Sequence, residues 1–156
     1  MKFFTKQETK VVIIILLVIS IFSFFNFRLA LRRARDNERK NDLGDITKLL
    51  DDYKNKNSLY PANLSLLKNA PKDPGTPSGY SYQYYTDGKF FQIYASLEGP
   101  DEPELNPKVI GRNIKCGNFI CNFGKTSGTD VPLDKSLEEY ENELYVRDLL
   151  RKKQAK

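Results

Sequence analysis

The chain has 156 residues, a formal net charge of +5, two cysteines and neither histidine nor tryptophan. Without histidine, a Ser-His-Asp or Cys-His catalytic set is excluded, and so is a zinc site of four Cys and His ligands. Because the usual equipment of an active site is missing, the composition indicates a structural or binding protein rather than an enzyme.

The positive charge gathers in two places, one just after the apolar N-terminal segment and one at the C-terminus. These basic residues are Arg28, Arg32, Arg33, Arg35, Arg39, Lys40, Arg147, Arg151, Lys152, Lys153 and Lys156. Basic residues beside a membrane span commonly face lipid headgroups. Since the sequence contains no nucleic-acid recognition motif, we expect no nucleic-acid partner.

An uncharged run, VVIIILLVISIFSFFNF, occupies residues 11–27. A helix of that length spans roughly 25 Å, which is at the lower end of what crosses a bilayer. A cleaved signal peptide would have a shorter apolar run followed by small residues, whereas RLALRRAR follows here. We therefore expect a short charged segment over residues 1–10 and a transmembrane helix over residues 11–27.

The charges around this span leave its orientation open. Lys2, Lys6 and Lys10 precede the apolar run, and more basic residues follow it. The positive-inside rule alone would therefore place the rest of the chain in the cytoplasm. The Tyr and Asn content of that part, together with its two cysteines, favours the opposite orientation.

A second helical pattern continues the first over residues 28–56. Apolar residues recur there at helical spacing, and they are Leu43, Ile46, Leu50 and Tyr53. Such a stripe can pack on a sheet while the polar neighbours face water. We expect one long helix whose first part lies in lipid and whose second part is amphipathic.

The clearest strand signal is YSYQYYT-DG-KFFQIYASLE, over residues 80–98. An Asp-Gly pair between two aromatic and β-branched runs is a strong signal for a two-residue hairpin turn. That turn predicts that Tyr84 lies opposite Phe91 and Tyr82 opposite Ile93. All four side chains would then face the stripe of the long helix.

Further elements are expected towards the C-terminus. Alternating apolar residues over 119–123 predict a strand, and Ser136 with Glu139 fits a capping box that starts a final helix. One face of this helix carries Leu137, Tyr140 and Leu144. It could dock on the domain or on a partner. The expected fold class is α+β, with a domain over residues 28–129 and a helical extension over residues 130–156.

This order of elements resembles the type IV pilin-like family, most closely the major pseudopilins of type II secretion systems. The start, FTKQETKVVIIILLVI, is similar to the family's prepilin start, and the matching positions are Phe4, Thr5 and Glu8. The long helix ends at an aromatic-Pro pair, Tyr60-Pro61, and LKNAPKDP is similar to the family's Lys-Asp-Pro loop. The hairpin is also similar, and the resemblance extends over residues 4–98.

The resemblance implies a filament subunit for protein secretion, which associates with itself and with other pseudopilins through its N-terminal helix. It also implies an inner-membrane assembly platform, with the N-terminus cytoplasmic and the domain outside. A separate cytoplasmic ATPase would supply the work, because this chain has no Gly-rich phosphate loop.

The start of the chain carries the implied assembly residues, Phe4 and Glu8. In the family a prepilin peptidase cuts after a glycine, and the carboxylate at the position of Glu8 pairs with the N-terminal amine of a neighbouring subunit. Here Phe3 replaces that glycine, so cleavage before Phe4 and an intact chain are both open. A carboxylate at the mouth of a membrane helix favours an incoming cation. The alternative is an interfacial Glu8 beside Lys6 and Lys10.

Cys116 and Cys121 lie in a turn-prone segment, CGNFIC. In an oxidising compartment they can close a small disulfide loop that contributes about 2 kcal/mol, and the alternative is two free buried thiols. Some family members bind calcium after the hairpin, where this chain has weak candidates in Asp101, Glu102 and Glu104. Prolines could hold that loop without an ion, and no other cofactor is expected.

Two other functions stay open. A type IV pilin for adhesion, motility or DNA uptake would have the same fold. A membrane-anchored binding or sensor module that does not polymerise would account for Phe3, Lys6 and Lys10, which depart from the family's pattern.

Overall fold

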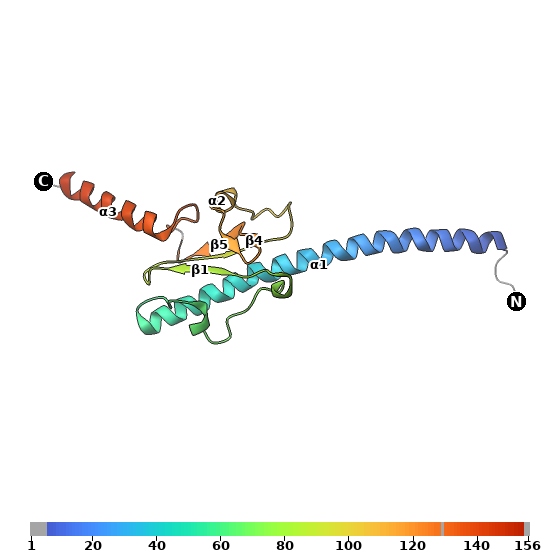
Figure 1. Ribbon diagram of the computed structural model, residues 1–156, viewed down its shortest axis with the longest axis horizontal. Helices are drawn as coiled ribbons and strands as arrows, with labels where there is room; N and C mark the ends of the chain where they lie inside the picture. Colours follow the sequence, from blue (N-terminus) through green and yellow to red (C-terminus); the bar gives the residue numbers. More distant parts are fainter. Residues whose placement is uncertain (1–5, 129, 155–156) are drawn as a thin grey trace. The chain divides into compact units, whose positions relative to one another are not determined.

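The computed structural model describes residues 6–128 and 130–154 (Figure 1). The chain divides into two compact units, one that ends at Ala34 and one that begins at Arg35. We call the unit that begins at Arg35 the head. The fold class is α+β, as expected, with a long N-terminal helix, small antiparallel sheets and a C-terminal helix.

Helix α1 runs from Lys6 to Asn57, so the expected long helix is confirmed. Within the apolar run, the hydroxyl of Ser20 donates to the carbonyl of Leu16 at 2.8 Å, which satisfies a polar group without water. At the other end Ser58 takes a left-handed conformation (φ 67°) and donates its N–H to the carbonyl of Lys54. This turn closes the helix one residue beyond the expected end.

The main sheet has three antiparallel strands in the order β1-β2-β5. These strands are β1 (Gln83–Thr86), β2 (Phe91–Ala95) and β5 (Phe123–Thr126). Two short strands, β3 (Lys115–Cys116) and β4 (Phe119–Ile120), form a separate hairpin. Figure 1 shows the sheet lying along the part of α1 that belongs to the head.

The predicted register of the β1–β2 hairpin is wrong by two residues. Tyr84 pairs with Ile93, not with Phe91, because the connection is a four-residue loop and not a two-residue turn. The carboxylate of Asp87 accepts the backbone N–H groups of Lys89 and Phe90, at 2.7 and 2.6 Å, and so widens the turn. A slip of two residues leaves every side chain on its predicted face.

The core between α1 and the sheet uses the predicted stripe. Its fully buried helix residues are Leu43, Ile46 and Leu50, and its fully buried strand residues are Phe91, Ile93 and Ala95. Tyr82 and Tyr84 pack at its edge, as expected. The edge-to-face contact between the rings of Tyr60 and Phe91, with centroids 4.9 Å apart, closes the end of this core.

The opposite face of β2 is also covered, by segments that follow it in the chain. A second cluster there contains Tyr94, Val109, Ile114, Cys116 and Cys121. Helix α2 (Pro107–Gly111) supplies Val109, and its N-cap Asn106 accepts the N–H of Lys108 at 3.0 Å. β2 is therefore buried on both faces, as a central strand should be.

The expected single strand over residues 119–123 is wrong. The chain changes sheet between β4 and β5, because the N–H of Cys121 donates to Ile114 and the N–H of Asn122 donates to Ala95. The side chain of Asn122 then bonds both the N–H and the carbonyl of Leu97, at 2.7 and 2.9 Å. These contacts fix the point at which the chain passes from the β3–β4 hairpin to the main sheet.

Helix α3 (Leu137–Gln154) begins at the predicted capping box. The carboxylate of Glu139 accepts the N–H of Ser136 at 2.8 Å, and the hydroxyl of Ser136 accepts the N–H of Glu139 at 3.2 Å. Leu137 and Tyr140 are buried against Val131 in a small third cluster. The first turns of α3 therefore dock on the head. Two 3₁₀ turns, η1 (Leu64–Leu66) and η2 (Thr76–Ser78), complete the fold.

Candidate functional site

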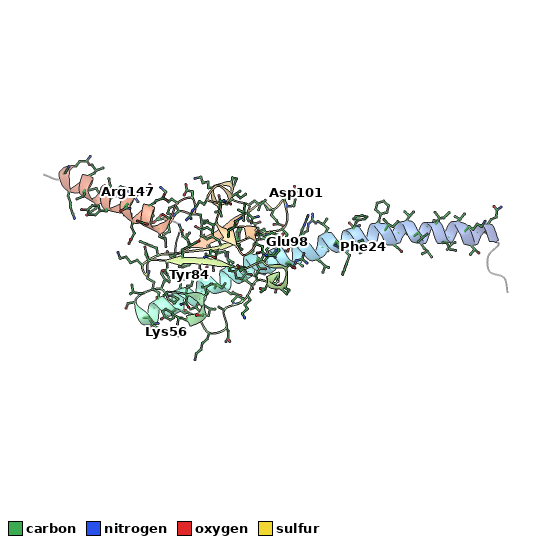
Figure 2. The ribbon with its side chains drawn as sticks, in the orientation of Figure 1. Phe24, Lys56, Tyr84, Glu98, Asp101 and Arg147 are labelled. Carbon is green, nitrogen blue, oxygen red and sulfur yellow. A yellow bond between two sulfur atoms is a disulfide. The ribbon has the colours of Figure 1, made fainter. Side chains whose placement is uncertain are left out.

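The apolar segment over residues 11–27 is bare. Each of its large apolar side chains is between 39% and 68% exposed, and Figure 2 shows those around Phe24 projecting from the helix. Among the residues that the structure describes, α1 is the one helix long and apolar enough to cross a membrane. A surface of this kind needs lipid or other apolar helices as its surroundings.

Glu8 lies in the first turn of α1 and is exposed. A carboxylate at this end of a helix is favoured by the helix dipole. Phe4, the other expected assembly residue, lies outside the described residues, as does the bond between Phe3 and Phe4.

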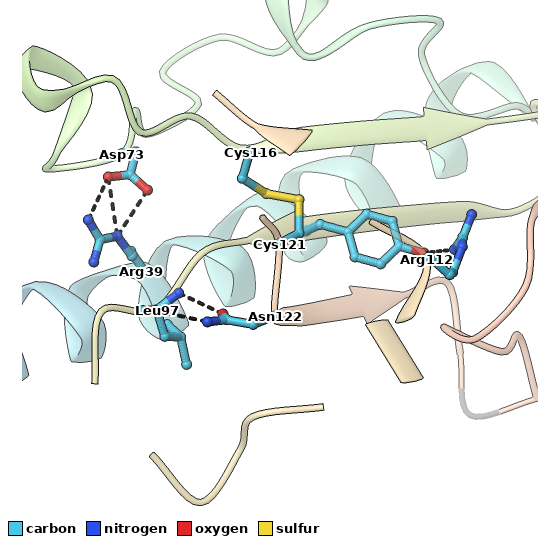
Figure 3. The surroundings of a disulfide bond; sticks show 8 residues. Arg39, Asp73, Leu97, Arg112, Cys116, Cys121 and Asn122 are labelled. Atoms are coloured by element: carbon cyan, nitrogen blue, oxygen red, sulfur yellow. Dashed lines mark hydrogen bonds and ion pairs between the residues drawn. A yellow bond between two sulfur atoms is a disulfide. The ribbon is translucent and has the colours of Figure 1, made fainter. Parts of the chain in front are cut away.

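A buried ion cluster lies on α1 where the head begins, and Arg39 is its centre. Arg39 and Asp36 are both fully buried, and one guanidinium nitrogen of Arg39 lies 2.8 Å from Asp36 and 2.9 Å from Glu98. The Nε of Arg39 lies 3.0 Å from the carboxylate of Asp73 (Figure 3). The guanidinium also stacks over the ring of Tyr80, 4.3 Å from its centroid.

Each carboxylate of the cluster has further partners. Asp36 accepts the backbone N–H groups of Glu98 and Gly99, both at 2.8 Å, and Asp73 accepts the N–H of Gly75 at 2.7 Å. Arg35 donates twice to Glu98, at 2.8 and 2.6 Å. The buried charges are therefore paired and hydrogen-bonded, which burial of charge requires.

The cluster shifts the pKa values of Glu98 and Arg39. Hydrogen bonds from Arg35 and also from Arg39 hold the pKa of Glu98 below its ordinary value, against an opposing effect of burial. Burial alone would lower the pKa of Arg39, but its bonds to Asp73 and the other carboxylates outweigh that effect and raise the pKa. Both shifts favour the charged forms of Glu98 and Arg39.

The acidic loop after β2 is held by α1. The ammonium group of Lys40 lies 2.7 Å from Glu102 and 2.9 Å from Glu104, and Asp101 is exposed in the same loop (Figure 2). No group of three or more acidic, His or Cys side chains is placed to hold a metal within the described parts of the chain. The calcium interpretation of Asp101, Glu102 and Glu104 therefore gains no support from their geometry.

Cys116 and Cys121 form the expected disulfide, with an S–S distance of 2.10 Å. Both are fully buried and pack in the cluster that contains Tyr94 (Figure 3). The hydroxyl of Tyr94 in turn accepts from Arg112, which also bonds Gln92. The disulfide thus closes the hairpin of β3 and β4 over the second face of β2.

The expectation that the basic residues after the apolar segment face lipid headgroups is wrong for Arg35, Arg39 and Lys40. All three pair with carboxylates of the head. A signal was present for Arg39, because it precedes Leu43 by four residues and so continues the apolar stripe of α1. A charged residue on a buried stripe predicts a buried partner.

No family model matches the chain, and no characterised protein or solved structure matches it either. The features that bear on function are therefore the bare apolar segment, the ion cluster where α1 enters the head, and the disulfide.

Removal of the central cation should destabilise the head. Arg39→Met leaves three carboxylates facing one another without their shared partner, so the free energy of unfolding should fall by about 3–5 kcal/mol. Tyrosine fluorescence during chemical unfolding of the full-length chain in detergent measures it. Lys48→Met is the control, because Lys48 pairs with Asp45 on the surface, and it should leave the midpoint unchanged. An unchanged midpoint for Arg39→Met would contradict a structural role for the cluster.

Acid should weaken the head partly through Glu98. The pKa of Glu98 is lowered in the folded head, so the charge of Glu98 stabilises the head fully above pH 4.5, its ordinary pKa. This stabilisation is lost as the pH falls through the lower pKa of the folded state. Glu98→Gln should therefore be less stable than the unaltered chain at pH 7, and the difference should shrink below pH 4.5. Asp42, whose pKa is raised by burial, titrates in both proteins. A difference independent of pH would show that Glu98 acts through something other than its charge.

Proposed function

We propose that this chain is a pseudopilin-like structural subunit. Residues 11–27 anchor it in the cytoplasmic membrane, with the N-terminus in the cytoplasm and the head outside. Copies assemble through their N-terminal helices into a filament of a type II secretion system or a related machine. The observation that carries this proposal is a helix that is apolar and bare over residues 11–27 and forms one wall of a folded core after Arg35.

The bare segment supplies a physical reason for assembly. A helix that is apolar on every side is stable in a bilayer, and it can leave the bilayer only where neighbouring helices replace the lipid. Many copies packed side by side would satisfy that condition in the core of a filament. The heads would then be displayed on the outside.

Glu8 supports a defined stagger between copies. Its carboxylate lies in the first turn of α1, at the start of the apolar run, where a nearby cation is favoured. A neighbouring copy's N-terminal amine would supply such a cation, and Phe4 would carry that amine if the leader is removed. The work of extraction would come from a separate cytoplasmic ATPase on an inner-membrane platform.

One finding favours a head outside the cytoplasm. The Cys116–Cys121 disulfide is typical of an oxidising compartment. The ion pairs of Arg35, Arg39 and Lys40 do not bear on orientation, because the positive-inside rule counts Lys and Arg and gives carboxylates little weight.

Crosslinking in membranes tests this function. The chain has no cysteines other than the disulfide pair, so two substitutions in one chain, such as Leu16→Cys with Phe22→Cys, let each copy link to two neighbours through the apolar segment. We expect a ladder of oligomers. Glu8→Ala should reduce the ladder while the amount of membrane-bound protein stays the same. Asp52→Ala, which removes an exposed acidic residue of the same helix, is the control and should keep it.

The alternatives give different results. Monomers at every position of the apolar segment would favour a membrane-anchored binding or sensor module. A ladder that Glu8→Ala leaves intact would remove Glu8 from the mechanism but would keep the filament.

A further inference from the structure

Helix α3 has a second apolar face that nothing in the head covers. Its first face packs through Leu137 and Tyr140, with Leu144 at the edge. The second face carries Tyr145, Val146, Leu149 and Leu150, which are 41% to 64% exposed. Since successive residues rotate by about 100° around a helix, this face points away from the first one. The two faces therefore cannot pack on the same surface.

The second half of α3 lacks support from the head. Every residue from Tyr145 to Gln154 is exposed, and Figure 2 shows Arg147 on this part of the helix. Ten residues are too few for a stable isolated helix in water, and the single ion pair from Asp148 to Lys152, at 2.7 Å, adds little. A partner packed on the second face would supply the missing stabilisation.

The charges of α3 indicate the nature of that partner. Its first half is acidic and its end is basic, with Glu138, Glu139, Glu141 and Glu143 followed by Arg147, Arg151, Lys152 and Lys153. A helix that lies on a lipid surface carries mainly basic residues on its polar face, whereas α3 carries five acidic residues, Asp148 included, and four basic ones. A helix with this separated charge is complementary to an antiparallel copy of itself.

We propose that α3 pairs two copies of this chain. Two α3 helices pack antiparallel through Tyr145, Val146, Leu149 and Leu150, and the acidic start of each lies beside the basic end of the other. Such a contact is isologous and is complete with two copies, so it does not by itself build a filament. It is independent of assembly through the apolar segment.

Some acidic residues of α3 bind groups of the same head, and one is exposed on the face that would contact the second copy. Glu141 and Glu143 pair with Lys89 and Lys135 of the same head, at 3.2 and 2.5 Å. Glu139 caps its own helix. Glu138 is exposed on the same face of the helix as Tyr145 and Leu149. Glu138 is thus the residue that meets the basic end of the second copy.

The pairing depends on confinement in the membrane. One helix face offers far less area than the roughly 800 Å² per partner that stable complexes bury. Anchoring of both copies in one bilayer raises their effective concentration. Dimers should therefore form in membranes and dissociate on dilution in detergent.

Crosslinking of two differently tagged full-length chains tests the arrangement. One chain carries Glu138→Cys and the other Lys153→Cys, and both are expressed in the same membrane and mildly oxidised. We expect dimers between the two tags, and no dimers of Glu138→Cys with itself. Lys48→Cys, on an exposed position of α1, is the control and should give none. Dimers of Glu138→Cys with itself, or a mixed-tag yield no higher than the control, would overturn the proposal.

A charge exchange separates pairing from other occupants of this face. On a Val146→Cys background, Glu138→Lys or Lys153→Glu alone should lower the dimer yield by about twofold to fivefold, as loss of a surface ion pair does. Both changes in one chain should restore it. A further loss in the double variant, or a yield that follows the anionic lipid content, would overturn the proposal. Repetition with Glu8→Ala keeps this result distinct from filament assembly.

Discussion

The constraint on which the structure depends is that one helix must be stable in two different environments. For seventeen residues α1 is apolar all round and bare, and after Ala34 it is apolar on one stripe that a sheet covers. Exposure of apolar surface to water costs about 25 cal/mol per Å², so the first part must lie in lipid or among similar helices. The helical conformation follows as well, since every backbone group in lipid must be paired within the chain.

The Arg39 cluster lies within the head, on the first turns of α1 that belong to it. Its carboxylates come from α1 itself, from the loop at Asp73 and from the end of the hairpin at Glu98. A buried ion pair adds little net stability compared with an apolar contact, because desolvation offsets the attraction. Its directional bonds instead fix where each loop lies along α1. We therefore assign the stability of the head to the stripe that contains Leu43 and Ile46, and the positions of its loops to Arg39.

Local patterns in the sequence predicted the parts of the fold that short-range interactions determine. The extent of α1, its apolar stripe, the capping box of Ser136 with Glu139 and the disulfide all depend on residues close together in the chain. The hairpin register was missed because the side chain of Asp87 binds two N–H groups and widens the turn. An Asp-Gly pair alone does not reveal this.

The ion cluster could be predicted only in part. The position of Arg39 on the apolar stripe signals a buried partner. Asp73, however, lies 34 residues away in the chain and Glu98 lies beyond the hairpin. Contacts of this kind depend on how the loops return to the helix, and no short sequence pattern encodes that path. The split between β4 and β5 has the same origin, since distant carbonyl groups bind Cys121 and Asn122.

We propose that residues 11–27 cross a membrane and hold the head outside the cytoplasm, and the topology of the full-length chain tests this most directly. The protein should stay with the membranes through an alkaline wash. Protease added to intact spheroplasts should remove the head and leave a protected fragment that contains the apolar segment. Release of the chain by the wash, or a head that is digested only after the cells are broken, would contradict the account.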